Sequence, residues 1–420
     1  LKERKKEVPG FELKVIQGWV SPFLSDGGGK TKKELKAIAD EYLAWNSPFW
    51  LRRFSFGFFR GHVHDKFLIA DGRRMILGGM NISDLDAEGG LTAKGSHDVD
   101  VLIDGPAVKQ ATEIFLKLNL LGHYLDSPAH FPPFEREEIQ ALQSYFYENQ
   151  EDHDFWTVDT DPNPKPPFRK INRVHIPIRS VLSNPRYFPE VESGDTSLRL
   201  IYDNPLIDRD PKTKKQYSKY FRTLKFVTSK AKRTLWVTTP YMTIDREIMA
   251  YFVESAKTLD VRIVTNSLDS TDMTGPFYLA QLSHYPELIK AGVKVYEWQG
   301  HAQLKRLQKD CEIGSWPGDL LHSKLVIVDG AVSFVGSNNI NNRSKNLNNE
   351  VMALVNDSAF SRRLEPYFTR LLNGETQSVK CREGTRALPL AEEMTLERSM
   401  ALWKTLGVKK PIWKYPHGGY

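Results

Sequence analysis

Two stretches of the chain repeat one set of polar residues and glycines at identical spacing. The first stretch supplies, in order, His64, Lys66, Asp71, Gly78, Gly79 and Asn81. Adding 258 to each number, as from 64 to 322, gives the second set: His322, Lys324, Asp329, Gly336, Ser337 and Asn339. The match needs no gap, and a repeat of this length indicates two copies of one structural unit.

The residue types in these two sets could together displace a group at a phosphodiester. Such a diester is anionic and resists attack, so its non-bridging oxygens need positive charge, which Lys66 and Lys324 could supply. Asn81 and Asn339 could donate hydrogen bonds to the same oxygens. One histidine would attack phosphorus to give a phosphohistidine, while the other would protonate the leaving alcohol and later deprotonate the incoming water or alcohol. This chemistry needs both copies of the set but no metal ion and no other cofactor.

An attacking histidine needs its second ring nitrogen held by a partner, and a carboxylate does this well. Asp98 and Glu350 are the candidates, because each precedes an apolar strand that follows its own motif. We predict that Asp98 holds His64 and that Glu350 holds His322. A lone His-x-Lys is usually structural, whereas two full copies at a constant offset favour a catalytic site.

The motifs are predicted to lie on strands and at the turns that join them. His322 and Lys324 are two residues apart, so a strand would direct both to the same face. The apolar runs that follow, Leu325 to Val328 and Ala331 to Val335, are typical of strands buried on both faces. Six motif residues are expected to shape these turns and strands: Asp71, Asp329, Gly78, Gly79, Gly336 and Ser337.

The complete pattern, H-x-K-(four)-D-(six)-G-[GS]-x-N present twice, resembles the signature of the phospholipase D superfamily. Three stretches, Gly78 to Asp84, Asp98 to Val108 and His322 to Val355, look like bacterial cardiolipin synthases of that superfamily. The resemblance implies an α/β protein of two fused phospholipase D-like halves, related by a pseudo-twofold axis, with the active site between them. Alternating strands and helices further predict a mixed, mainly parallel sheet flanked by helices in each half.

Composition divides the chain into four parts. A stretch rich in Pro, Glu, Asp and Asn separates the motifs and is predicted to be a linker or insertion. The predicted parts are the first half at 1–125, the linker at 126–196, the second half at 197–380 and a C-terminal tail at 381–420. In the second half a strand and a helix precede the strand that starts at Val261, and their first-half counterparts would fall before Leu1. We therefore expect the natural chain to extend upstream, where any signal or membrane anchor would lie.

The overall charge favours an anionic partner. The chain has a formal net charge of +6 and a pI near 9.0, which suits a phospholipid surface or nucleic acid without choosing between them. The stretch from Trp45 to Arg60 is dense in aromatic residues and arginine, and is predicted to be either a core strand or a rim at a lipid interface. Only Cys311 and Cys381 are present, so there is no disulfide framework. The sequence shows no Cys/His metal spacing and no apolar run of the ~20 residues that a membrane span needs.

The resemblance also implies a reaction and partners. The reaction is phosphatidyl transfer between two phospholipids with release of an alcohol, at a membrane surface, by a protein peripherally associated with the bacterial cell envelope. A hydrolytic phospholipase D that releases phosphatidic acid shares the covalent intermediate and is an alternative. We expect no nucleic-acid partner, and a nuclease of the same superfamily is a second alternative. A non-catalytic membrane-binding protein is a third. By resemblance to lipid-cleaving members, we predict His64 as the nucleophile and His322 as the general acid.

Overall fold

The computed structural model describes both motifs and the elements around them. The described residues are 1–18, 30–45, 62–81, 96–125, 156–160, 171–176, 196–204, 217–271, 275–299, 311–312, 320–372, 376–381 and 384–413. Most of the aromatic and arginine-rich stretch 45–60 and most of the predicted linker 126–196 lie outside them. Within the predicted linker, β8 (Trp156–Thr160) and β9 (Ile171–Ile176) form an antiparallel pair.

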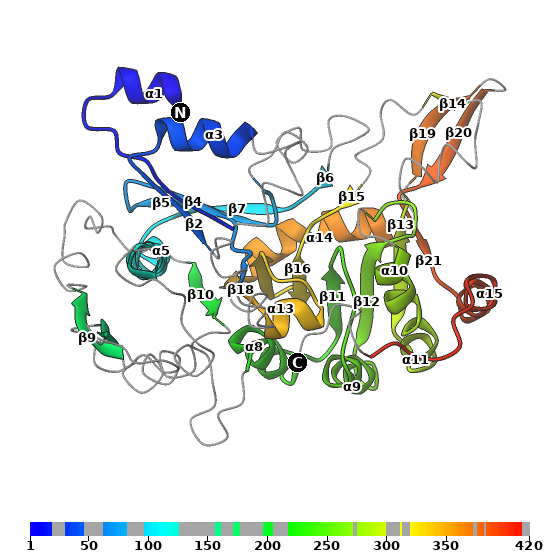
Figure 1. The fold of residues 1–420 in the computed structure, drawn as a ribbon. Helices are drawn as coiled ribbons and strands as arrows, with labels where there is room; N and C mark the ends of the chain where they lie inside the picture. The colour runs from blue at the N-terminus through cyan, green and yellow to red at the C-terminus, as the bar shows by residue number, and fades with distance from the viewer. Residues whose placement is uncertain are drawn as a thin grey trace.

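A nine-stranded mixed sheet forms the body of the C-terminal region (Figure 1). Its main path follows the order β10 (Ser197–Asp203), β18 (Asn348–Asn356), β17 (Val332–Gly336), β16 (Leu325–Val328), β11 (Thr234–Thr238), β12 (Asp260–Asn266), β13 (Lys294–Trp298) and β21 (Ala391–Glu393). The ninth strand, β3 (His62–Val63), comes from the N-terminal region and pairs in parallel with the start of β18. β12 pairs in parallel with β11 and β13, whereas the other neighbours along the path are antiparallel.

The predicted mixed α/β fold with flanking helices is confirmed. The prediction that parallel pairing dominates is wrong for the described strands. Each motif itself contains a tight turn, at Asp71-Gly72 and at Asp329-Gly330, where one strand reverses into the next. A turn this short can join only antiparallel neighbours, because parallel neighbours need a long crossover connection.

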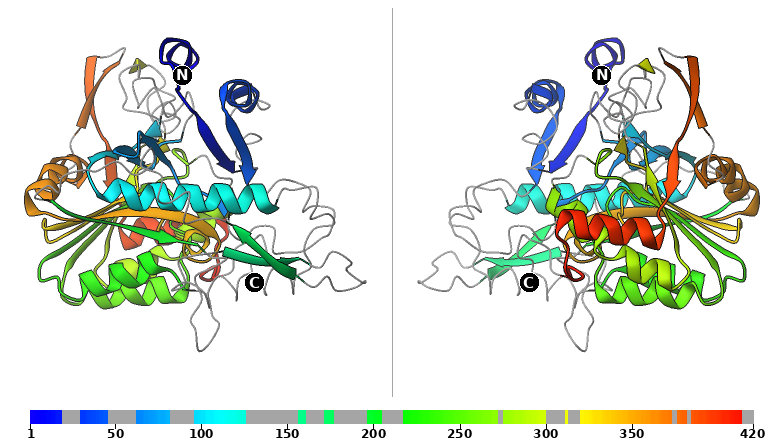
Figure 2. Two further views of the ribbon diagram at one scale, coloured as in Figure 1. Left: turned by 90° about the vertical axis from the view of Figure 1, so that its left-hand side faces the viewer. Right: turned by 90° about the vertical axis from the view of Figure 1, so that its right-hand side faces the viewer.

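Helices cover both faces of the large sheet. On one face lie α8 (Lys219–Thr228), α9 (Arg246–Ser255), α10 (Gly275–Leu282) and α11 (Tyr285–Lys290), and on the other lie α5 (Ala107–Leu125) and α14 (Ser358–Leu372). In Figure 2, α5 is cyan and runs along one side of the sheet, with the green helices on the opposite side. Short polar side chains cap the N-termini of α8, α9, α13 (Asn342–Asn346) and α15 (Leu396–Leu406) by accepting backbone hydrogen bonds: Ser218, Asp245, Asn341 and Thr395.

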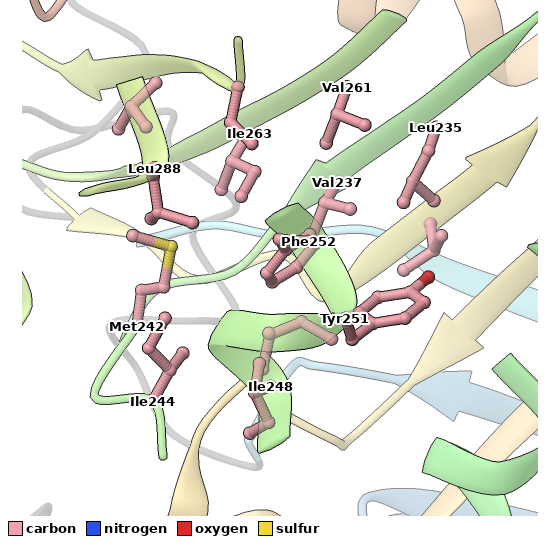
Figure 3. Close-up of a cluster of buried hydrophobic side chains, with 14 of the residues drawn as sticks. Leu235, Val237, Met242, Ile244, Ile248, Tyr251, Phe252, Val261, Ile263 and Leu288 are labelled. Atoms are coloured by element: carbon pink, nitrogen blue, oxygen red, sulfur yellow. The ribbon is translucent and has the colours of Figure 1, made fainter. Parts of the chain in front are cut away.

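The central strands are apolar on both faces because they separate two hydrophobic cores. Along β16, Leu325 and Ile327 join the core that contains α14, whereas Val326 and Val328 join the core beneath α8 to α11. Figure 3 shows part of the second core, with Phe252 of α9 among the side chains of β11 and β12. Full burial of a Val, Leu, Ile or Phe side chain contributes about 1.5–3 kcal/mol. This two-sided burial explains the unbroken apolar run that follows His322.

The N-terminal motif lies on a smaller antiparallel sheet that has the register of its C-terminal counterpart. Its order is β4 (Phe67–Ala70), β5 (Arg74–Gly78) and β7 (Asp100–Asp104). The matching cross-strand pairs are Gly78 with Asp100 and Gly336 with Met352. Asp98 and Glu350 therefore hold equivalent positions, each two residues before the partner of the motif glycine. Nearby, β1 (Lys14–Gly18) pairs in parallel with β2 (Glu41–Trp45), beside α1 (Lys2–Glu7) and α3 (Lys30–Ile38).

Two short parallel pairings join the N-terminal and C-terminal regions. β3 runs beside β18, and β6 (Ser96–His97) runs beside β15 (Leu320–Leu321). The core that contains α14 also mixes side chains of β5 and β7 with those of β16 to β18. The two motif regions are therefore packed together, while the pseudo-twofold relation of the whole halves stays a prediction.

The remaining strands form a separate arm. β14 (Cys311–Glu312), β19 (Thr376–Cys381) and β20 (Gly384–Pro389) pair in antiparallel fashion (Figure 1). Across the part of the chain that the structure describes, no helix combines the length and the apolar character needed to cross a membrane.

Candidate active site

Each motif histidine is held by the carboxylate of the other motif region. His64 Nδ1 lies 2.9 Å from Glu350 Oε2, and His322 Nδ1 lies 2.7 Å from Asp98 Oδ2. The predicted pairing, Asp98 with His64 and Glu350 with His322, is therefore wrong. The two carboxylates do hold the two histidines, but the partners are exchanged between the halves.

The exchange follows from the two parallel pairings that join the regions. β3 leads into His64 and runs beside the start of β18, so the His64 backbone N–H donates to the Asn349 carbonyl oxygen at 3.1 Å. β15 leads into His322 and runs beside β6, so the His322 N–H donates to the His97 carbonyl oxygen at 2.8 Å. In both cases the residue after the acceptor is the carboxylate. The backbone contact thus brings the carboxylate of one half to the histidine of the other.

The motif lysines lie beside their own histidines and act across the interface between the two regions. Lys66 Nζ donates to the His64 carbonyl oxygen at 2.6 Å, and Lys324 Nζ donates to the His322 carbonyl oxygen at 2.5 Å. The charge of Lys324 also lowers the pKa of His64 and of Asp98, which both belong to the N-terminal region. The cation of one motif therefore acts on the histidine of the other, as expected if both motifs form one site.

His64 and Glu350 form a pair in which the acid is ionised. Burial alone would raise the pKa of Glu350, but His64, Lys66 and the hydroxyl of Ser337 together lower it to about 2. Burial lowers the pKa of His64 below its ordinary value of 6.5, and Lys66 lowers it further, although Glu350 opposes both. A neutral His64 whose Nδ1–H donates to Glu350 keeps the Nε2 lone pair free. That is the form in which an imidazole attacks phosphorus.

The histidine of the second pair is more deeply buried than that of the first. The His322 and Asp98 side chains are 7% and 3% exposed, whereas His64 is 22% exposed. Burial would raise the pKa of Asp98, but Lys324 and His322 outweigh this and lower it, so Asp98 is a carboxylate at neutral pH. The two histidines thus have the same kind of partner but differ in access to solvent.

Comparison with known proteins finds similarity to cardiolipin synthases. The family model described as "Cardiolipin synthase, PLD-like domain" matches residues 227–372. Cardiolipin synthase of Geobacillus thermodenitrificans is 27% identical over 352 residues, which cover 81% of this chain and 53% of that protein. Cardiolipin synthase 2 of Bacillus cereus is 35% identical over 135 residues, which cover 32% of this chain and 22% of that protein. The chain is therefore similar to cardiolipin synthases over most of its length, and residues 227–372 match their PLD-like domain.

A solved structure supports the same fold. Phosphatidylserine synthase of Haemophilus influenzae matches with a TM-score of 0.51 and 14% identity, covering 97% of this chain and 83% of that one. This likeness concerns the fold alone. The chain spans about half the length of the Geobacillus cardiolipin synthase that it matches.

Two residues of this site were not predicted to support a histidine. Ser337, expected to be structural, donates its hydroxyl to Glu350 Oε2 at 2.6 Å, and Asn348 donates Nδ2 to Glu350 Oε1 at 3.0 Å. Gly79 replaces Ser337 in the first motif, where a Cβ would lie 2.2 Å from Asp98 Oδ1. The serine-for-glycine difference between the repeats was the sequence signal for this role of Ser337. A serine hydroxyl can donate to a nearby carboxylate, whereas a glycine only leaves space for it.

The predicted turn and strand residues of the two motifs lie in tight turns and at close backbone contacts. Asp71 and Asp329 have φ angles of 53° and 55°, the left-handed conformation that Asp tolerates in tight turns. The Asp329 carboxylate also accepts the backbone N–H groups of residues 232 to 234 at 2.8–2.9 Å. At Gly78 and Gly336 an added Cβ would lie 1.5 Å from Asp100 Oδ1 and 2.2 Å from the Val351 carbonyl oxygen. Glycine is needed at both places for this close approach.

The predicted phosphate-binding asparagines, Asn81 and Asn339, follow the ends of the two motif strands. Asn339 is buried, and its Oδ1 has no hydrogen-bond partner among the described residues, while its backbone N–H donates to Ser344 Oγ at 3.2 Å. Their contact with a phosphate stays a prediction. Among the residues that the structure describes, no cluster of three His, Cys, Asp or Glu side chains has the arrangement to hold a metal ion.

Proposed function

We propose that this chain transfers a phosphatidyl group between phospholipids through a covalent phosphohistidine. The observation that carries the proposal is the pair of exchanged contacts, His64 with Glu350 and His322 with Asp98. These contacts orient both imidazoles, and burial together with the charges of Lys66 and Lys324 lowers the pKa of His64. Both observations support a single site for double displacement at a phosphodiester. The name shared by the relatives, cardiolipin synthase, supports a phospholipid as the donor.

In the first displacement, Nε2 of neutral His64 forms a bond to phosphorus, and the bond to the headgroup alcohol breaks. His322 gives its proton to the departing alkoxide and becomes neutral. Glu350 stabilises the positive charge that develops on His64, since the carboxylate accepts the Nδ1–H. The lowered pKa of His64 favours it as the nucleophile, because a protonated imidazole has no lone pair to offer.

In the second displacement, an alcohol takes the place of the departed headgroup. Neutral His322 removes the proton of the incoming hydroxyl, the new oxygen bonds to phosphorus, and the bond to His64 breaks. Asp98 holds His322 in both steps and stabilises its protonated form. Lys66 and Lys324 offset the charge on the non-bridging oxygens, with Asn81 and Asn339 donating to the same oxygens.

We propose a second phospholipid as the acceptor, so that the product carries two phosphatidyl groups, and peripheral attachment to a membrane as the location of the reaction. The net charge of +6 favours an anionic lipid surface. Hydrolysis would use the same intermediate, with water in place of the second lipid.

The test is to incubate the purified protein with phosphatidylglycerol vesicles and to identify the products by mass spectrometry. Cardiolipin and free glycerol in equal amounts, absent with His64→Ala and with His322→Ala, would support the proposal. Phosphatidic acid as the sole product would show that the protein hydrolyses the lipid and does not transfer the phosphatidyl group. Parallel reactions with single-stranded and double-stranded DNA distinguish a nuclease, and vesicle binding without turnover would contradict catalysis on lipids altogether.

A further inference from the structure

The side chain of Asn266, at the end of β12, pairs with the backbone of the residue that precedes His322. Asn266 Nδ2 donates to the Leu321 carbonyl oxygen at 2.8 Å, and the Leu321 N–H donates to Asn266 Oδ1 at 3.0 Å. The amide thus acts as a neighbouring strand would, filling both backbone hydrogen bonds of one residue. Asn266 Nδ2 also donates to the Pro240 carbonyl oxygen at 3.0 Å, and the side chain is fully buried.

The opposite side of the same segment is held by the N-terminal region. Leu321 is the parallel-strand partner of His97, and the His322 N–H donates to the His97 carbonyl oxygen. The residue after His97 is Asp98, the partner of the His322 ring. The backbone at His322 is therefore fixed between β6, which leads into Asp98, and the side chain of Asn266.

A second layer of buried polar groups holds Asn266 itself. Gln281 Nε2 donates to the Asn266 carbonyl oxygen at 2.8 Å and to the Tyr285 hydroxyl at 2.7 Å. That hydroxyl donates to Glu297 Oε1 at 3.1 Å. All four residues are buried, and in such a network each group restricts the orientation of the next. Asn266 therefore holds Leu321 with little freedom to move.

We propose that Asn266 is a positioning residue for His322, fixing the backbone so that the ring meets Asp98 and the substrate phosphorus. The inference rests on the proposed function but does not depend on which histidine is the nucleophile. Loss of the amide leaves Leu321 held from one side only. A displacement of a catalytic group by 1 Å can cost about 100-fold in rate.

The matched control is Asn119→Ala. Asn119 is also a buried asparagine, and its Nδ2 donates to Glu41 Oε2 at 2.7 Å, in a part of the fold that does not support His322. The variants Asn266→Ala and Asn266→Asp are compared with it and with His322→Ala. Aspartate keeps the acceptor for the Leu321 N–H but lacks the donor to its carbonyl oxygen.

Two readouts decide the question. The first is the ratio of kcat for an alkyl and a p-nitrophenyl phosphatidyl ester. The alkoxide is a poor leaving group that needs a proton from His322, whereas p-nitrophenolate leaves without one. Asn266→Ala should shift this ratio by about ten-fold or more in the direction that His322→Ala shifts it, with KM little changed and Asn266→Asp intermediate. The second is the NMR signal of the proton that His322 Nδ1 shares with Asp98, which Asn266→Ala should broaden or move.

Asn119→Ala should leave both readouts at the wild-type values. A folded Asn266→Ala protein with an unchanged ratio and an unchanged proton signal would overturn the proposal. If that variant does not fold, Asn266→Asp decides by the same readouts. If the wild-type protein cleaves neither ester but the proton signal still depends on Asn266, the proposed function fails while the positioning role stands.

Discussion

The exchange of carboxylates between the two histidines leads to the sharpest prediction. Glu350→Gln keeps the size of the side chain but removes the charge that faces His64 Nδ1 at 2.9 Å. The pKa of Glu350 falls from 4.5 to about 2 in the fold. This corresponds to about 3 kcal/mol of net stabilisation of the ionised form, at 1.36 kcal/mol for each pKa unit, to which His64, Lys66 and Ser337 all contribute. Loss of this whole stabilisation as positive charge develops on His64 would slow phosphoenzyme formation by about 10²-fold.

A second effect adds to this loss. The amide of glutamine can present its NH₂ group to Nδ1, which favours the tautomer of His64 that carries the proton on Nε2. That tautomer cannot attack, and a change from carboxylate to amide at the equivalent place in a catalytic triad costs about 10⁴-fold. We therefore expect Glu350→Gln to lower the rate by about 10²–10⁴-fold. Ser337→Ala, which removes one hydrogen bond to Glu350, should have a smaller effect of the same kind.

The assay separates the two pairs by comparing carboxylate variants with histidine variants. With a p-nitrophenyl ester, His64→Ala should form no phosphoenzyme, whereas His322→Ala should still form one that can be trapped by rapid quenching. Glu350→Gln should form the phosphoenzyme from this ester at least about 10²-fold more slowly than wild type, whereas Asp98→Asn, like His322→Ala, should still form one that can be trapped. The pairing expected from sequence gives the opposite assignment. A Glu350→Gln protein that behaves like His322→Ala would refute the exchange.

Three further predictions test the buried acid, the turns and the metal-free chemistry. Burial raises the pKa of Glu297 from 4.5 to about 7, so the folded state binds this proton more tightly than the unfolded state. The stability of the wild-type protein therefore falls as the pH rises from 4.5 to 7. In denaturant titrations, the unfolding free energy of Glu297→Gln should rise relative to wild type by up to about 3 kcal/mol between pH 4.5 and 8. Asp329→Asn should lose about 1 kcal/mol of unfolding free energy with kcat unchanged, because its carboxylate accepts backbone N–H groups, while the exposed turn variant Asp71→Asn should lose less. Dialysis against EDTA should leave turnover unchanged. Turnover that EDTA abolishes and one specific divalent ion restores would contradict the metal-free chemistry.

The sequence alone predicted those parts of the site that depend on residues close together in the chain. The spacing of His322, Lys324 and Asp329 follows the strand and turn that carry them, and the offset of 258 places the first motif on the same frame. The equivalence of Asp98 and Glu350 could also be read from the repeat, and the matched registers of β7 and β18 bear it out.

Which carboxylate meets which histidine could not be predicted, because the answer depends on contacts between distant parts of the chain. β3 is separated from β18, and β6 from β15, by more than 200 residues, and each pairing involves two residues on either side. Strands this short carry too little pattern to reveal their partners. The preference for parallel strands was misjudged for a related reason: alternation of helices and strands suggested crossovers, whereas the motif turns make hairpins.

The roles of Asn266 and Ser337 were not predicted either, although the serine-for-glycine difference between the repeats was a signal for Ser337. Asn266 ends an ordinary apolar strand, and only the fold brings its amide to Leu321. Both residues support the histidines indirectly: Asn266 lies outside the spacing pattern that marks the site, and Ser337 lies within it at a position where the first motif has glycine.

The most direct test of the account is to identify the covalent intermediate. The wild-type protein is mixed with phosphatidylglycerol vesicles, quenched in acid-free denaturant within milliseconds, digested and examined by mass spectrometry for phosphatidyl adducts. The account predicts an adduct on His64 that forms and decays at rates matching turnover, that is absent from His64→Ala, and that accumulates when no acceptor hydroxyl is available. Turnover of the lipid with no adduct on either His64 or His322 would contradict it.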